Sequence, residues 1–255
     1  SLEYMDGVTF NLIDWADDQV LTEQIFNALE STDEQDFVYT ISVQAHGKYP
    51  RAPLDGFEPT IFAEGIEDED FDYAFEYYLS QIKKPDDFLG DLVAALEEFD
   101  EPVILVAYGD HLPNFEIDES GIDNGSRFET EYVIWNNIGL GKQDKDLTTY
   151  QLGAEVLKRA GISCGLLPKL HQNFSDRYNY LEMLELIEYD VFYGANFVDY
   201  VGYVDNKLML IRPVNGKNYD SFILSNYFDN MLLGAAAADD VTLAAIELID
   251  KLPET

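Results

Sequence analysis

A carboxylate and an imidazole stand side by side directly after an apolar run. The segment VAYGDHLPNF, residues 106–115, ends the run VILVAY and passes through Gly109 into Asp110 and His111. Neighbouring side chains point to opposite faces within a strand, but the turn that Gly109 permits lets both side chains face one ion. A carboxylate oxygen and an imidazole nitrogen suit a divalent metal such as Mn²⁺, Mg²⁺ or Zn²⁺. The alternative is that Asp110 caps a turn and His111 is incidental.

The chain has three histidines, and two of them follow predicted strands. The β-branched and aromatic run DFVYTISVQ, residues 36–44, predicts a strand that ends just before His46. Ligands gather at the carboxyl ends of strands in open parallel sheets. We therefore expect His46 to lie near Asp110 and His111, as a donor to an anionic oxygen. The alternative is a loop residue stacked on Tyr49.

Three further residues carry side chains that could take part in chemistry. Trp15, in LIDWADD, either packs at a helix start or offers an aromatic face to a sugar or glycerol. His171 follows no clear strand, so we interpret it as structural. The single cysteine, Cys164, excludes an internal disulfide and a multi-thiolate zinc site, and we interpret it as a small apolar filler. No Gly-rich phosphate loop, GxSxG or HExxH motif occurs, so the sequence identifies no nucleophile.

The charge balance narrows the possible partners. The chain has 50 Asp and Glu against 15 Lys and Arg, which gives a net charge of −35. Nucleic-acid binding is excluded because a phosphate backbone needs a basic face, and electrostatic docking on an anionic membrane is excluded for the same reason. Such a charge is typical of a salty or extracellular setting. The negative charge also indicates that the function requires a divalent cation, because a bound cation can hold an anionic substrate against the negative electrostatic potential of the chain.

The length and hydropathy indicate a globular chain with no membrane-spanning segment. It has 255 residues, of which 47% are hydrophobic. No apolar run approaches the roughly 18–20 residues that cross a bilayer. The sequence begins with Ser1 rather than Met and shows no signal peptide. We therefore interpret it as a processed chain or as a piece of something longer.

The periodicity predicts alternating strands and helices. Such an order favours a layered α/β/α sandwich with a mostly parallel sheet over residues 1–195, followed by a small α+β appendage over 196–255. Pro85 is expected to kink or divide the helical region around it. The predicted elements are helices at 18–30, 70–99, 148–160 and 241–252, strands at 36–44, 101–109 and 130–137, and a hairpin at 197–214.

Four segments in order resemble a known family. They are FVYTISVQAHGKYP, PVILVAYGDHLPNF, TEYVIWNN and LEMLELIEYDVFYG. Together they resemble the second half of the lipoteichoic acid synthase-like sulfatase domain, in the alkaline phosphatase superfamily. The run YYLSQIKKPDDFLGDLVAALEEF is similar to the helix that precedes the GDH strand of that family. The resemblance covers roughly residues 10 to 195.

The resemblance implies a fold, a setting and a reaction. It implies a partial α/β/α sandwich on the extracellular face of a bacterial cell membrane, in a parent protein anchored by upstream transmembrane helices. Members bind one divalent cation, most often Mn²⁺, with Mg²⁺ or Ca²⁺ as alternatives. A Thr nucleophile attacks a phosphodiester such as phosphatidylglycerol and passes glycerol phosphate to an acceptor.

The resemblance also implies roles for individual residues. Asp110 and His111 match the two metal ligands of the GDH motif, and His46 matches the histidine that contacts the substrate phosphate. Trp15 matches an aromatic residue near the glycerol pocket. The basic residue expected soon after this Trp is absent, because residues 16–18 are Ala-Asp-Asp. This difference leaves the substrate open.

No part of the chain matches the first half of the family, which carries the Thr nucleophile and an early acidic ligand. We therefore expect the carboxyl-terminal part of a phosphoglycerol transferase or sulfatase-like hydrolase, with no catalytic nucleophile and no turnover by itself. Its partners would be the missing N-terminal half and an anionic lipid head group or cell-wall polymer, carrying a phosphodiester or sulfate ester. The alternative is a non-catalytic extracellular domain that binds cell-wall glycan or a protein. A phosphodiesterase or phosphatase with another substrate is a third hypothesis.

Overall fold

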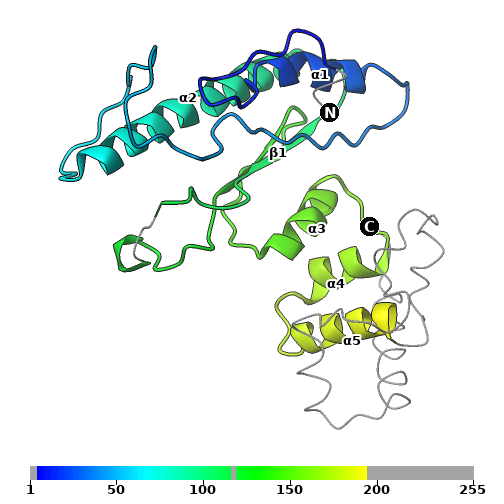
Figure 1. The fold of residues 1–255 in the computed structure, drawn as a ribbon. Coiled ribbons are helices and arrows are strands. Elements are labelled where there is room, and N and C mark those ends of the chain that lie inside the picture. The colour runs from blue at the N-terminus through cyan, green and yellow to red at the C-terminus, as the bar shows by residue number, and fades with distance from the viewer. Residues whose placement is uncertain (1–4, 116–118, 194–255) are drawn as a thin grey trace. The chain divides into compact units, whose positions relative to one another are not determined.

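The structure, a computed structural model, describes residues 5–115 and 119–193. The chain divides into two compact units, residues 1–139 and 140–255, and each is described by itself. Figure 1 labels the helices and the first strand. The predicted boundary near 196, the hairpin at 197–214 and the helix at 241–252 lie outside the described residues.

Two helices and a strand pair form the core of the first unit. The predicted helices at 18–30 and 70–99 are confirmed as α1, Val20–Leu29, and α2, Glu69–Glu97. The Asp68 carboxylate caps α2 by accepting hydrogen bonds from the next turn. Apolar side chains recur at helical spacing and bury one stripe of α2 against α1 and the strands. The buried centre of this core consists of Leu21, Phe88, Leu92 and Leu96.

The long helix α2 continues through Pro85, so the expected division there is wrong. A proline inside a helix removes one hydrogen bond and crowds the preceding turn. Here buried residues lie on both sides of the proline, with Tyr77 before it and Phe88 and Leu92 after it. Their burial stabilises the helix on both sides of the proline.

The two strands predicted after α2 are confirmed, but they pair differently from the expectation. The strands are β1, Ile104–Tyr108, and β2, Tyr132–Asn136, and they form a two-stranded antiparallel sheet in which Val106 lies opposite Ile134. The loop between them includes the short 3-10 helix η2, Glu119–Gly121. Within the described residues no parallel strand pair occurs, and the layered parallel sheet stays a prediction.

The strand predicted at 36–44 is wrong for the structure as it stands. This segment has no strand conformation. Most of its side chains are open to solvent, with Phe37 92% exposed and Ile41 64% exposed, whereas Gln44 at its end is buried. The Tyr39 hydroxyl lies 3.4 Å from the Tyr108 hydroxyl at the end of β1. A β-prone sequence becomes a strand only when a neighbouring strand accepts its backbone hydrogen bonds.

Three helices make up the described part of the second unit. The predicted helix at 148–160 is confirmed as α3, Thr149–Arg159, and Gly161 follows it with a φ of +74°. Sequence reasoning missed α4, Leu166–Phe174, whereas α5, Tyr180–Phe192, matches the segment LEMLELIEYDVFYG. Their shared core contains Leu170, Tyr180, Met183 and Ile187. Among the described residues, no helix combines the length and apolar character needed to cross a bilayer.

Candidate functional site

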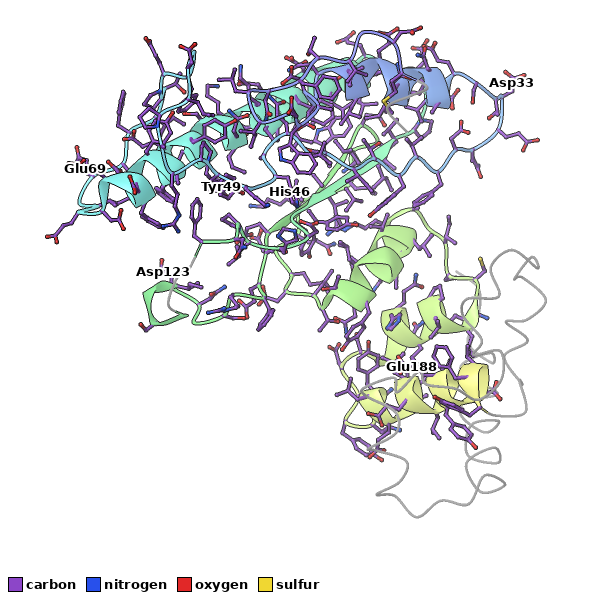
Figure 2. The ribbon with its side chains drawn as sticks, viewed as in Figure 1. Asp33, His46, Tyr49, Glu69, Asp123 and Glu188 are labelled. Atoms are coloured by element: carbon purple, nitrogen blue, oxygen red, sulfur yellow. The ribbon has the colours of Figure 1, made fainter. Side chains whose placement is uncertain are left out.

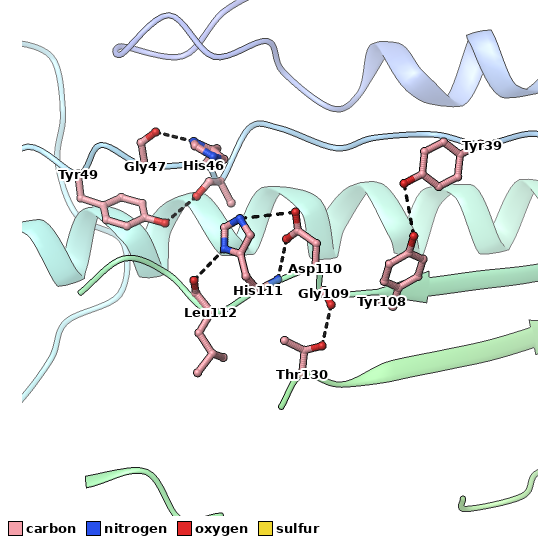
Figure 3. A network of polar contacts seen from close by, with 11 residues as sticks. Tyr39, His46, Gly47, Tyr49, Tyr108, Gly109, Asp110, His111, Leu112 and Thr130 are labelled. Carbon is pink, nitrogen blue, oxygen red and sulfur yellow. Dashed lines mark hydrogen bonds and ion pairs between the residues drawn. The ribbon is translucent and has the colours of Figure 1, made fainter. Parts of the chain in front are cut away.

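The structure brings four of the predicted site residues together in the first unit. The ring centroids of His46 and His111 are 6.1 Å apart and the two rings are nearly perpendicular, at 83°. The Trp15 ring lies 4.7 Å from the His46 ring. Asp110 immediately precedes His111, and Figure 3 shows its carboxylate beside the His111 ring. Residues that are far apart in the sequence therefore meet at one edge of β1.

The end of β1 is held by the strand beside it. The Gly109 N–H donates to the Glu131 carbonyl at 3.2 Å, and the Thr130 hydroxyl donates to the Gly109 carbonyl at 2.7 Å. A side chain at Gly109 would place its Cβ 3.4 Å from the Thr130 Cβ. This is an ordinary van der Waals contact, so the two hydrogen bonds, rather than a need for glycine, fix the point at which the chain leaves the sheet.

The hydrogen bonds of His111 define which ring nitrogen has a free lone pair that can bind a metal ion. His111 Nδ1 lies 2.9 Å from the Leu112 carbonyl, and a carbonyl oxygen only accepts, so Nδ1 carries the hydrogen. Nε2 then lies 3.5 Å from Asp110 Oδ2. The other carboxylate oxygen, Oδ1, accepts from the His111 backbone N–H at 2.8 Å, as the turn-capping alternative expects. The side chains of Asp110 and His111 are 79% and 62% exposed, so a ligand can reach both.

His46 and Trp15 share one backbone acceptor. His46 Nδ1 lies 2.7 Å from the Gly47 carbonyl, and Trp15 Nε1 donates to the same oxygen at 3.1 Å. By the same reasoning as for His111, Nδ1 of His46 carries a hydrogen and Nε2 is available. Tyr49 does not stack on His46, because its ring contacts are with Tyr78 and Phe115.

An aromatic cluster beneath the two histidines joins their loops to α2. Its members are Tyr49, Phe71, Phe75, Tyr78 and Phe115, with Tyr49 stacked on Phe115 at 4.8 Å. Figure 2 shows Tyr49 close to His46 on the segment beside α2. Burial, with a smaller contribution from Tyr78, raises the pKa of Tyr49 to about 12. Its hydroxyl therefore remains a donor to the Ala45 carbonyl at neutral pH, at 3.0 Å.

A set of polar side chains, which we call the polar clamp, joins the Trp15 turn to the His46 loop. It consists of Asn11, Asp18 and Gln44. Asn11 accepts from the Trp15 N–H at 3.0 Å and donates to the Gln44 carbonyl at 3.0 Å. Asp18 accepts from the Ser42 hydroxyl at 2.7 Å, and its N–H donates to Gln44 Oε1 at 3.0 Å. Sequence reasoning missed the clamp because single polar residues there form no periodic pattern.

Replacing Asp18 by Ala tests the clamp. The Asp18 side chain is buried and also accepts from the Val43 N–H at 3.2 Å. Its loss leaves the Ser42 hydroxyl and the half-buried Val43 N–H without this acceptor, and we expect the free energy of unfolding to fall by about 2 kcal/mol. Urea unfolding measures the change, with Asp6→Ala, an exposed carboxylate, as the control that stays within about 0.5 kcal/mol of the original chain. Equal stability of both variants would contradict the role of the clamp.

The donor chemistry at the end of β1 fits part of a metal site. In the described stretches of the chain, no group of three or more His, Cys, Asp and Glu is placed to hold a metal ion. Asp110 and His111 present two acceptors that face each other, an oxygen and an available nitrogen 3.5 Å apart. The His111 Nδ1–H that points at a carbonyl is the arrangement that orients metal-binding histidines. The pair suits a divalent cation that takes further ligands from elsewhere.

The third histidine, His171, lies in the second unit among aromatic rings. Its ring is 5.9 Å from those of Tyr150 and Tyr180, and Nδ1 lies 2.8 Å from the Tyr180 hydroxyl. Burial lowers the pKa of His171. These surroundings agree with the structural interpretation of His171.

The lowered pKa of His171 predicts a pH dependence of stability. The unfolded chain takes up a proton at higher pH than the folded chain, so the folded state loses stability as pH falls from about 6.5 through the folded pKa. We expect His171→Gln to remove this part of the slope in urea unfolding measured between pH 7.5 and 5.5. Burial raises the pKa values of Glu185 and Glu188. These two carboxyl groups therefore add stability to the folded state as pH falls, and they do so equally in both proteins. Identical slopes for the two proteins would contradict the prediction.

Comparison with known proteins identifies what the chain is similar to. Residues 2–162 match the protein family described as Sulfatase. The chain is 27% identical over 186 residues to the "Putative cyclic beta-1,2-glucan modification protein" of Rhizobium meliloti (strain 1021). This stretch covers 64% of the chain and 29% of the relative, so the chain spans less than a third of that protein. No solved structure matches.

Proposed function

We propose that this chain, which belongs to the sulfatase family, supplies the metal-binding and phosphate-contacting part of an enzyme that acts on phosphodiesters or sulfate esters. Membership of the family implies an α/β fold and, in general, a divalent metal. The observation that carries the proposal is the meeting of His46 with Asp110 and His111 at the end of β1.

Within this family we propose the lipoteichoic acid synthase-like type, which transfers phosphoglycerol. Support comes from the four segments that resemble it, with GDH directly after the apolar strand. The name of the Rhizobium relative refers to modification of a glucan, which supports a saccharide as the acceptor. The head group of an anionic lipid, or a cell-wall polymer, would supply the phosphodiester.

Asp110 and His111 would hold the divalent metal, for which Mn²⁺ is the first choice and Mg²⁺ or Ca²⁺ the alternatives. Such an ion supplies Lewis-acid stabilisation of charge on the phosphoryl oxygens and a lowered pKa for a bound nucleophile. Asp110 offers Oδ2 and His111 offers Nε2. The Nδ1 contact to the Leu112 carbonyl keeps the His111 ring in this orientation.

His46 would act on the phosphate itself. When protonated, its ring donates from Nε2 while Nδ1 stays on the Gly47 carbonyl. That N–H can hydrogen-bond a non-bridging oxygen or protonate the departing alkoxide. Trp15, fixed by its own hydrogen bond to Gly47, would pack against the glycerol or sugar part of the substrate.

The remaining features of the enzyme belong to the proposal as well. The nucleophile and a further acidic ligand would come from the missing N-terminal half, so the chain alone would not turn over. The complete protein would have a layered α/β/α sandwich and would act on the extracellular face of a bacterial membrane, anchored by upstream helices.

A non-catalytic glycan-binding domain is the second candidate. The half-buried Trp15 favours it, because an indole ring held by a hydrogen bond to Gly47 can serve as a platform for a sugar. This candidate requires no metal and no role for Asp110.

Metal-dependent cleavage of a phosphodiester by the full-length protein tests the proposed function. We expect activity that is lost on chelation and restored by Mn²⁺. Activity that needs no metal would reject the proposed metal site. Binding of glucan with no turnover of any phosphodiester or sulfate ester would reject the enzyme and favour the glycan-binding domain.

A further inference from the structure

A cavity in the second unit is lined by residues of the segment that begins at Leu140 and of helix α3. Its cavity volume is about 340 Å³. Four charged residues line it, and we call the site they form the basic pocket: Lys145, Glu155, Lys158 and Arg159. Three of the four are cations.

The charge of the basic pocket contrasts with that of the whole chain. Residues 1–139 contain 5 Lys and Arg against 33 Asp and Glu, whereas residues 140–193 contain 6 against 8. Three of the six basic residues of 140–193 line the basic pocket. A concave surface with one sign of charge focuses the electrostatic field and concentrates ligands of the opposite sign.

The single carboxylate in the basic pocket does not cancel its positive charge. Glu155 is buried and accepts from Lys145 Nζ at 2.7 Å and from Arg159 Nε at 3.3 Å. Burial alone would raise the pKa of Glu155, but the hydrogen bond from Lys145 and the nearby positive charges outweigh it, and the pKa is lowered. After this pairing the pocket keeps an excess of two positive charges.

Lys158 is the cation that internal ion pairing does not explain. Its side chain is exposed and makes no ion pair or side-chain hydrogen bond with any residue that the structure describes. The Arg159 side chain is 12% exposed. Its guanidinium is oriented by Glu155 and by the Gly141 carbonyl, which accepts from Nη1 at 3.4 Å. A fixed guanidinium beside a lysine ammonium is the donor set that phosphate and sulfate oxygens bind.

We propose that the basic pocket binds the phosphate or sulfate group of an anionic ligand. The ligand would lie against Lys158 and Arg159, while Glu155 and Lys145 hold Arg159 in place. The inference is independent of the proposed function, because none of its residues belongs to the site at the end of β1. The alternative is a pocket that serves only to stabilise the buried Glu155 carboxylate, whose pKa Lys158 also lowers through its charge, and this pocket would bind no anion.

Titration with inorganic phosphate and sulfate tests the proposal. Backbone amide spectra of the whole chain are recorded with either anion and with chloride at matched ionic strength. We expect saturable shifts at Gly141 and Lys158 with phosphate or sulfate, and Lys158→Ala should weaken the binding about tenfold. Lys84→Ala, which removes an exposed lysine from α2, is the matched control and should leave it unchanged.

Three results would overturn the proposal. Chloride could give the same shifts, which would mean general ionic screening. Binding could remain at full strength in Lys158→Ala, or it could weaken equally in Lys84→Ala, and either result would remove the basic pocket as the site. Since Lys158 is exposed, its replacement should leave the fold intact, and circular dichroism checks this.

Discussion

The change Asp110→Asn is expected to weaken Mn²⁺ binding by this chain at least about 100-fold. Loss of an outer partner of a metal site costs roughly 10–100-fold in affinity, and Asp110 would be a direct ligand that also loses its charge. Oδ2 of Asp110 lies 3.5 Å from His111 Nε2, so the substitution leaves a single nitrogen donor. Isothermal titration calorimetry with Mn²⁺ measures the affinity directly.

The control for this substitution is Asp123→Asn, which removes the same charge from an exposed position elsewhere in the first unit. We expect its Mn²⁺ affinity to equal that of the unchanged chain. If both variants lose affinity to the same extent, the ion is attracted by the net charge of −35. That outcome would remove Asp110 as a ligand.

Replacing His46 by Gln is expected to separate catalysis from metal binding. In the full-length protein the rate should fall about 10²–10⁴-fold, the range that general acid–base groups contribute. The Mn²⁺ affinity of the chain should stay the same, because His46 would face the phosphate. Steady-state kinetics on a phosphodiester and calorimetry on the chain provide the two measurements.

His171→Gln is the matched control, because it makes the same substitution at the third histidine, which lies in the second unit. It should change neither the rate nor the metal affinity. If His46→Gln weakens Mn²⁺ binding as much as Asp110→Asn does, then His46 is a metal ligand and its proposed role on the phosphate is wrong. An unchanged rate would remove His46 from catalysis altogether.

Elements with a strong local signal could be predicted from the sequence. The apolar run VILVAY contains β1 and the run YVIWN forms β2, and the helix predicted at 148–160 corresponds to α3. The local sequence does not show whether two strands pair in parallel or antiparallel, because the direction of pairing depends on which other strands are present in the sheet. The same holds for 36–44, whose side chains Phe37 and Ile41 remain exposed without a partner strand.

The candidate site could be predicted from the sequence only in part. His46 and His111 lie close together as predicted, with ring centroids 6.1 Å apart. The basis of that prediction, two parallel strands that end at one edge of a sheet, is not found among the described residues. Asn11 and Gln44 carry no comparable signal, since their contacts join segments that are 33 residues apart. The residues that position a site are thus harder to predict than the residues that perform its chemistry.

The most direct test of a shared metal and phosphate site uses the three histidines as reporters. Paramagnetic Mn²⁺ is added below stoichiometry and the imidazole signals are followed by NMR. We predict that the signals of His111 and His46, whose rings are 6.1 Å apart, broaden first, and that Asp110→Asn abolishes this early broadening. Earlier broadening of His171 than of the other two, or unchanged broadening in Asp110→Asn, would contradict the site at the end of β1.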